Sequence, residues 1–188
     1  WYNSARPWRL VFTATDKYRG NANLVMKAPD GQILARWSAH NQIVWLACEE
    51  RDFPYGENCF CPPQPEPSTP PRFGEPARYW LRPDLWHKDE PAYGPGGYLI
   101  NNVPGGREIF VHSKSPRNGA WRDRTWGCIR IPYGDMEKLI EFVEWIDRYT
   151  CALILVYINA PALSVEDYKG NEESAQTSYS SVGNWRHG

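Results

Sequence analysis

Apolar positions along the chain predict a mainly β protein with one principal helix. Short runs rich in β-branched and aromatic residues indicate strands at residues 8–15, 23–28, 32–39, 42–48, 77–81, 98–102, 108–112 and 151–158. The second and third of these runs flank a Pro-Asp-Gly turn, which is typical of a hairpin. Between residues 134 and 149 the apolar positions recur at helical spacing, at Met136, Leu139, Ile140, Val143 and Ile146.

Proline and glycine indicate long connections between these elements. The chain has 17 Pro and 15 Gly, and residues 49–76 are so rich in proline that they exclude a helix or a central strand. A loop of this length in a compact domain is usually functional or held by a cross-link such as a disulfide. Residues 166–188 are polar and predict a C-terminal tail, so residues 1–165 form the expected single domain.

Charge and composition narrow the class of protein. Lys and Arg (21) nearly balance Asp and Glu (22), so no basic surplus favours a nucleic-acid partner. No apolar run approaches the roughly 20 residues of a membrane span, and the sequence from Trp1 shows no signal peptide. The 10 Trp and 11 Tyr are many, and such rings line grooves that stack on sugars or peptides as well as filling cores.

The five cysteines fall into three groups. Cys48, Cys59 and Cys61 cluster in the proline-rich region, where a disulfide is expected in an oxidising compartment. A lone Cys-x-Cys pair is weak evidence for zinc, so we expect no metal and no cofactor. Cys151 lies in an apolar run and is expected to be a buried, inert thiol. Cys128 stands apart, between a glycine and polar loop residues.

His112 and Cys128 have the order expected of a base and a thiol nucleophile. His112 ends an apolar run, and Cys128 follows 16 positions later. A thiol attacks a carbonyl as thiolate, so a histidine within reach has to take its proton. That histidine needs an acceptor on its other nitrogen, for which Ser113 is the nearest residue. The N–H groups of Gly127 and Cys128 are the expected oxyanion donors. The alternative is a buried structural cysteine beside an ordinary histidine.

Other residues near this pair are expected to contact substrate. Arg130 lies two positions after Cys128, so in an extended segment both side chains point to the same face, where Arg130 could hold a carboxylate or brace the loop. We also expect substrate contacts from Trp126, Tyr98, Trp121 and Thr125. Loop packing and turn capping explain the same four residues equally well.

The segment from His112 resembles the signature of the L,D-transpeptidases, the YkuD-like domain. His-Ser, a loop, and then Thr-x-Gly-Cys-Ile-Arg-Ile match its usual order of His, loop, Ser/Thr-His-Gly-Cys-x-Arg/Asn. Gly-Pro-Gly-Gly-Tyr at residues 94–98 is similar to an upstream family motif, and the hairpin, helix and last strand follow in the family's order. The resemblance implies an L,D-transpeptidase-like β-sandwich with one principal helix, with inserted loops at 49–76 and 78–93.

Two positions depart from the family pattern. Trp126 stands where the family has a second histidine, so His112 has to move the proton alone. Gly94 replaces the threonine of the upstream motif. Divergent members of this kind include effector toxins of type VI secretion, and that class would imply an immunity or secretion partner protein.

The resemblance implies cysteine-dependent acyl transfer on the tetrapeptide stems of peptidoglycan, through a thioester on Cys128. An amine of another stem, a D-amino acid or water would resolve it, which gives transpeptidase, exchange or carboxypeptidase activity. The expected location is the periplasm or the secreted fraction. Two alternatives stay open: a papain-like wall peptidase or amidase, which would place its cysteine before its histidine, and a non-catalytic wall- or glycan-binding module.

Overall fold

The structure, a computed structural model, describes residues 7–42, 77–103, 108–118, 121–123, 125 and 127–161. The described strands are β1 (Trp8–Ala14), β2 (Ala22–Lys27), β3 (Ile33–Ala39), β4 (Tyr79–Trp86), β5 (Gly97–Asn101), β6 (Ile109–His112), β7 (Ile129–Arg130) and β8 (Ile154–Asn159). A short 3-10 turn, η1 (Pro116–Asn118), and one α-helix, α2 (Tyr133–Thr150), complete the described elements.

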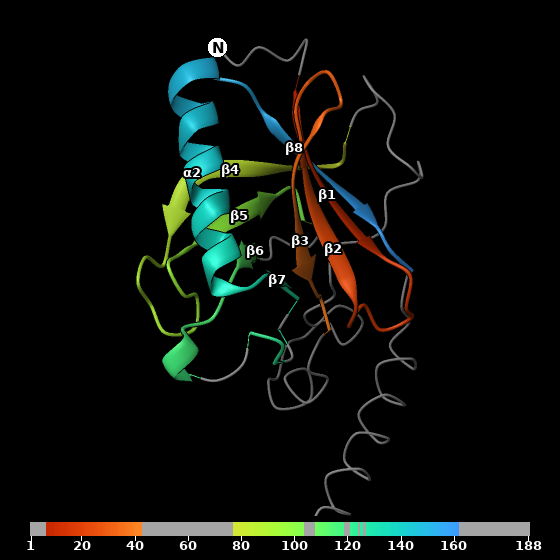
Figure 1. Ribbon diagram of the computed structural model, residues 1–188, viewed down its shortest axis with the longest axis vertical. Helices are drawn as coiled ribbons and strands as arrows, with labels where there is room; N and C mark the ends of the chain where they lie inside the picture. The colour runs from red at the N-terminus through yellow and green to blue at the C-terminus, as the bar shows by residue number, and fades with distance from the viewer. Residues whose placement is uncertain are drawn as a thin grey trace, which may run out of the picture.

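The described strands form one sheet that nearly closes on itself (Figure 1). Its order is β3-β2-β1-β8-β4-β5-β6-β7, and the pairs β1–β8 and β6–β7 are parallel. The two edges meet just after β3. There His40 and Arg130 exchange two backbone hydrogen bonds, of 3.0 and 2.9 Å. This bridge brings the N-terminal hairpin next to β7, although the two lie far apart in the sequence.

The hydrophobic core fills the inside of this curved sheet, and α2 packs against it. Alternate strand residues point inward, as period-2 geometry requires. Buried residues of α2, at helical spacing, pack in the same core: Met136, Leu139, Val143 and Ile146. Each fully buried Leu, Ile or Val contributes about 1.5–3 kcal/mol. Figure 1 shows α2 lying along the side of the sheet formed by β4, β5 and β6.

The prediction of a mainly β fold with one principal helix is confirmed in the described part of the chain. The two halves of the expected sandwich belong to one continuous sheet, because β8 joins β1 to β4. Part of the predicted inserted loop 78–93 is a strand, because residues 79–86 form β4. Pro83 lies where the register of β4 shifts, and a shifted register tolerates proline.

The last predicted strand begins later than its apolar run. Cys151 ends α2 in the left-handed conformation (φ 47°) and is exposed, so the expectation of a buried thiol is wrong. β8 then begins at Ile154. The proline-rich loop 49–76, the strand predicted at 42–48 except Gln42, and the tail 166–188 lie outside the described residues. Within the described residues, no helix is both long and apolar enough to cross a membrane.

Candidate active site

His112 and Cys128 lie on the same face of two paired strands. β6 and β7 run parallel with Val111 opposite Ile129 and His112 opposite Arg130, so Cys128, just before β7, lies beside Phe110. The Phe110 N–H donates to Cys128 Sγ at 3.4 Å. His112 (4% exposed) and Cys128 (9% exposed) are both buried on the outer face of the sheet, away from α2. The structure therefore brings the predicted base and nucleophile together.

A backbone carbonyl fixes the proton of His112. His112 Nδ1 lies 2.5 Å from the carbonyl oxygen of Ser113. A carbonyl can only accept, so Nδ1 holds the proton and Nε2 is left as an acceptor. Burial is the main reason why the pKa of His112 falls to about 3, and the nearby Arg130 charge adds to it. Ser113 thus orients the base through its backbone, while its hydroxyl is buried with no hydrogen-bond partner among the described residues.

The thiol of Cys128 is neutral at neutral pH. Burial raises its pKa to about 11, although the Phe110 N–H and the Arg130 charge act in the opposite direction. In the described part of the chain no hydrogen bond joins His112 to Cys128. They occupy diagonal positions on neighbouring strands, because His112 lies opposite Arg130 and Cys128 lies two residues before Arg130. With both groups neutral, an attack by this thiol on a carbonyl would require His112 to take the proton during the attack rather than beforehand.

Arg130 lies opposite His112 in β7 and bonds to the backbone of His40. Its Nη1 donates to the carbonyl oxygen of Asp123 at 2.9 Å, and its Nε is buried without a partner among the described residues. Burial is the main reason why the pKa of Arg130 is lowered. Arg130 therefore braces the loop before Cys128 and keeps one donor for another acceptor.

One of the two predicted oxyanion donors is already occupied. Gly127 has φ of 112°, which favours glycine, and its N–H donates to Thr125 Oγ1 at 3.2 Å. Thr125 Oγ1 in turn donates to the carbonyl oxygen of Cys128 at 2.9 Å. Gly127 therefore shapes the turn rather than offering a free donor, and Thr125 is a buried residue of the loop rather than an exposed substrate contact. The N–H of Cys128 is left, since none of the described residues accepts from it.

The loop before Cys128 is held by residues near the end of β3. His40 Nε2 lies 2.8 Å from the carbonyl oxygen of Trp121, and the Thr125 N–H donates to the carbonyl of Gln42 at 2.7 Å. Burial lowers the pKa of His40 to about 4, so this histidine is neutral and donates to Trp121. The Trp121 ring is half-buried beside His40 and under the Arg122 guanidinium, 4.7 Å from its centroid. His40 shows no spacing to a partner residue in the sequence.

Tyr98 does not belong to this site. It is fully buried in the core on the α2 side of β5, and burial raises the pKa of its hydroxyl. The reason is strand alternation, because Tyr98 is paired with Val111, whose side chain points inward. The prediction that Tyr98 lines a substrate groove is wrong for this arrangement.

Tyr93 is the aromatic residue that the sequence reasoning missed. Its ring lies 4.7 Å from the His112 ring and 5.5 Å from the Phe110 ring, centroid to centroid. Burial is the main reason why the pKa of Tyr93 is raised. This packing needs Gly97, because a Cβ there would lie 3.2 Å from the Cβ of His112. The contact of Tyr93 with His112 and Phe110 depends on folding, so no pattern in the sequence predicts it.

Four predicted residues lie outside the described part of the chain: Trp126 and the three disulfide candidates Cys48, Cys59 and Cys61. Within the described residues, no three histidine, cysteine or carboxylate side chains gather closely enough to hold a metal ion.

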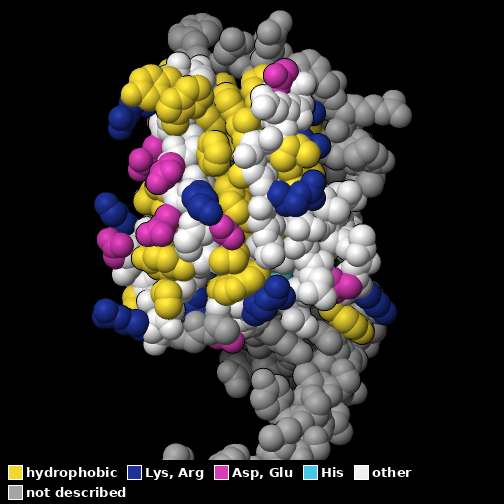
Figure 2. Space-filling view, in the orientation of Figure 1, with side chains coloured by type: hydrophobic (Ala, Val, Ile, Leu, Met, Phe, Trp, Pro, Cys, Tyr) yellow, Lys and Arg dark blue, Asp and Glu magenta, His cyan; other side chains and the backbone are white. Residues whose placement is uncertain are grey.

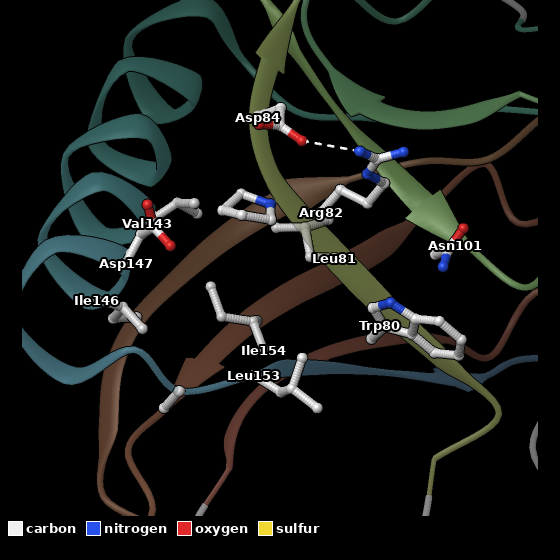
Figure 3. Close-up of a pocket in the computed structure, with 12 residues that line it drawn as sticks. Trp80, Leu81, Arg82, Asp84, Asn101, Val143, Ile146, Asp147, Leu153 and Ile154 are labelled. Atoms are coloured by element: carbon white, nitrogen blue, oxygen red, sulfur yellow. Dashed lines mark hydrogen bonds and ion pairs between the residues drawn. The ribbon is translucent and has the colours of Figure 1, made fainter. Parts of the chain in front are cut away.

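Two hollows of the described surface lie away from Cys128. One, of about 320 Å³, lies between β4, α2 and the start of β8, and Figure 3 shows Arg82 beside Asp84 at its rim. The other, of about 450 Å³, is an apolar groove near the end of α2 at which Figure 2 shows gathered hydrophobic side chains. His112 and Cys128 line neither hollow. The candidate site is therefore defined by the positions of its side chains and not by a pocket.

No protein-family model matches the sequence, and no curated protein is similar to it at a significant level. The assignment of an activity therefore depends on the motif and the geometry of the residues around Cys128.

Proposed function

We propose that this protein is a cysteine acyltransferase that acts on the stem peptides of peptidoglycan. The observation that supports it best is the pairing of β6 with β7, which places the free acceptor nitrogen of His112 on the same face as the thiol of Cys128. A thiol, a neutral base with a fixed tautomer and a backbone N–H donor are the parts that acyl transfer requires.

The chemistry follows from these parts. Cys128 Sγ attacks the carbonyl of the third stem residue, a diamino acid, and His112 Nε2 takes the thiol proton. The negative oxygen of the intermediate is stabilised by the N–H of Cys128. The bond to D-Ala then breaks, the D-Ala nitrogen receives the proton from His112, and a thioester remains on Cys128. A stem amine, a D-amino acid or water attacks this thioester and restores the thiol.

The substrate class is supported by the sequence motif. His112-Ser113 and the Thr-x-Gly-Cys-Ile-Arg run resemble those of the L,D-transpeptidases, and the same motif favours action in the periplasm or outside the cell. The divergence at Trp126 favours the effector kind of this enzyme, with an immunity or secretion partner. Arg130, which lies opposite His112 on the neighbouring strand, is the proposed contact for a substrate carboxylate.

Purified muropeptides test this proposal directly. After incubation with the protein, mass spectrometry should show loss of D-Ala, exchange of D-Ala for an added D-amino acid, or a joined dimer. Cys128→Ala should abolish every product, and Cys151→Ser is the matched control because Cys151 is the exposed free thiol. Unchanged product formation by Cys128→Ala would end the proposal. Unmodified muropeptides with the parent protein would exclude this substrate class.

A further inference from the structure

A buried amide lies directly behind the peptide that joins Gly127 to Cys128. Asn41 follows the bridge residue His40 and is 1% exposed. Its Nδ2 donates to the carbonyl oxygen of Gly127 at 2.7 Å and to that of Cys128 at 3.0 Å. Nothing in the sequence connects position 41 with position 128, because they meet only when β7 closes against the end of β3.

Arg19 fixes which way the Asn41 amide points. Arg19 is 1% exposed, and its Nη1 donates to Asn41 Oδ1 at 3.0 Å. The Arg19 Nε and Nη2 donate to the carbonyl oxygen of Pro161 at 3.1 and 2.9 Å, and the Asn41 N–H donates to the carbonyl of Arg19. Because a guanidinium has donors only, Oδ1 has to face it and Nδ2 has to face the two carbonyls. The amide therefore has one stable orientation.

The same bonds determine the direction of the Cys128 N–H. The Gly127 carbonyl and the Cys128 N–H belong to one planar trans peptide, in which the two groups point in opposite directions. When Asn41 holds the Gly127 oxygen on its own side, the Cys128 N–H is turned away from Asn41. Gly127, with φ of 112°, supplies the backbone freedom that this orientation needs.

We propose that Asn41, oriented by Arg19, is a positioning residue that holds the Cys128 N–H as the oxyanion donor of the site. This inference rests on the proposed acyl transfer, and it assigns to Asn41 a role in forming the oxyanion hole rather than in activating the thiol. Losing an oxyanion donor slows acyl transfer by about 10²- to 10³-fold. Alkylation of the same thiol builds no oxyanion and should not depend on Asn41.

Asn41→Asp tests this separation with nearly the same side-chain volume. The carboxylate would still accept from Arg19, but its second oxygen would face the two carbonyl oxygens and repel them. Asn102→Asp is the matched control, because Asn102 Nδ2 also donates to a backbone carbonyl, that of Arg78 at 2.8 Å, away from Cys128. Both changes are made with Cys151→Ser, and peptide mapping by mass spectrometry follows modification at Cys128 alone.

Two reactions of Cys128 are then compared in the full chain. Acylation by p-nitrophenyl acetate forms a thioester, releases p-nitrophenolate and passes through an oxyanion, whereas alkylation by iodoacetamide forms a thioether and releases iodide. We expect Asn41→Asp to slow acylation by about 10²-fold while alkylation changes less than about threefold. The control should change neither rate.

Two results would overturn the inference: equal slowing of both reactions by Asn41→Asp, or acylation at the parent rate. The proposed function fails separately. If the parent protein leaves muropeptides unchanged but Asn41→Asp still slows acylation selectively, the substrate class is wrong and the role of Asn41 stands.

Discussion

The two faces of β6 and β7 are both closed to water, yet they are built from different chemistry. On the inner face, Ile109, Val111 and Ile129 pack in the core with α2. On the outer face, His112 and Cys128 are buried under loops and the end of β3. Each inner residue is next in sequence to an outer one. The alternation of side chains along two short strands therefore separates the residues of the core from those of the candidate site.

Burial has opposite consequences on the two faces. On the inner face, burial removes apolar area from water and stabilises the fold, and the apolar side chains need no hydrogen-bond partner. Outside, burial disfavours charge, so it lowers the pKa of His112 and raises the pKa of Cys128. Hydrogen bonds have to compensate for the lost water there: the Phe110 N–H donates to Cys128 Sγ, His112 Nδ1 donates to the Ser113 carbonyl, and Asn41 Nδ2 donates to the Gly127 carbonyl. The comparison teaches that burial alone identifies neither core nor site.

The largest difference between the two faces is expected when neighbouring residues of β6 are substituted one at a time. His112→Gln removes the base, and we expect acyl transfer to fall by about 10²- to 10⁴-fold. Val111→Ala should instead lower the free energy of unfolding by about 1.5–3 kcal/mol and leave the rate per folded molecule near the parent value. Product assays and urea denaturation measure the two effects. A large loss of rate in Val111→Ala would show that the faces are not separate.

Acid should destabilise the protein through the outer face. The pKa values of His40 and His112 are lowered to about 4 and about 3 in the folded protein, mainly by burial. Below pH 6.5 the unfolded chain therefore takes up protons that the folded protein does not, and stability falls as pH falls. By pH 4.5 the loss should be on the order of 2 kcal/mol for each histidine.

Urea denaturation at pH 7.5, 6.0 and 4.5 measures this loss. His40→Gln should make the protein less sensitive to acid, whereas Val111→Ala should lower stability equally at all three values. If His40→Gln and the parent protein lose the same stability between pH 7.5 and 4.5, the explanation by buried histidines is wrong.

A smaller effect on stability is expected at Gly97, which packs against His112 and Tyr93 on the outer face. Gly97→Ala would place a Cβ 3.2 Å from the Cβ of His112 and 3.4 Å from Tyr93, so the rings have to shift. We expect a cost of about 1 kcal/mol in unfolding free energy and a slower reaction. Gly134→Ala is the matched change in α2, where a Cβ meets nothing within 4 Å, and it should stabilise by up to about 1 kcal/mol. Equal stability changes in both variants would contradict this packing.

The smallest effect on the protein is expected at the second free cysteine. Cys151 is exposed at the end of α2, whereas Cys128 is buried with a raised pKa. Iodoacetamide at pH 7.5 should therefore modify Cys151 before Cys128, and peptide mapping can follow the two sites. Cys151→Ser should leave stability and acyl transfer unchanged. Faster modification of Cys128 would indicate a thiol more accessible or more ionised than this structure has.

Local pattern determined the elements and the reactive pair. Helical spacing from Met136 to Ile146 predicted α2, and the Pro-Asp-Gly turn predicted the hairpin of β2 and β3. The order of His112 and Cys128 predicted a base and a nucleophile, because the motif lies within one short stretch of chain. These features depend on neighbours in sequence, so the sequence alone is enough to find them.

Tertiary structure decided what depends on residues far apart. Asn41 and Arg19 reach Cys128 only because the sheet nearly closes, and Tyr93 reaches His112 only because Gly97 leaves room. Periodicity cannot show which strand edges meet, because that depends on hydrogen bonds between distant segments.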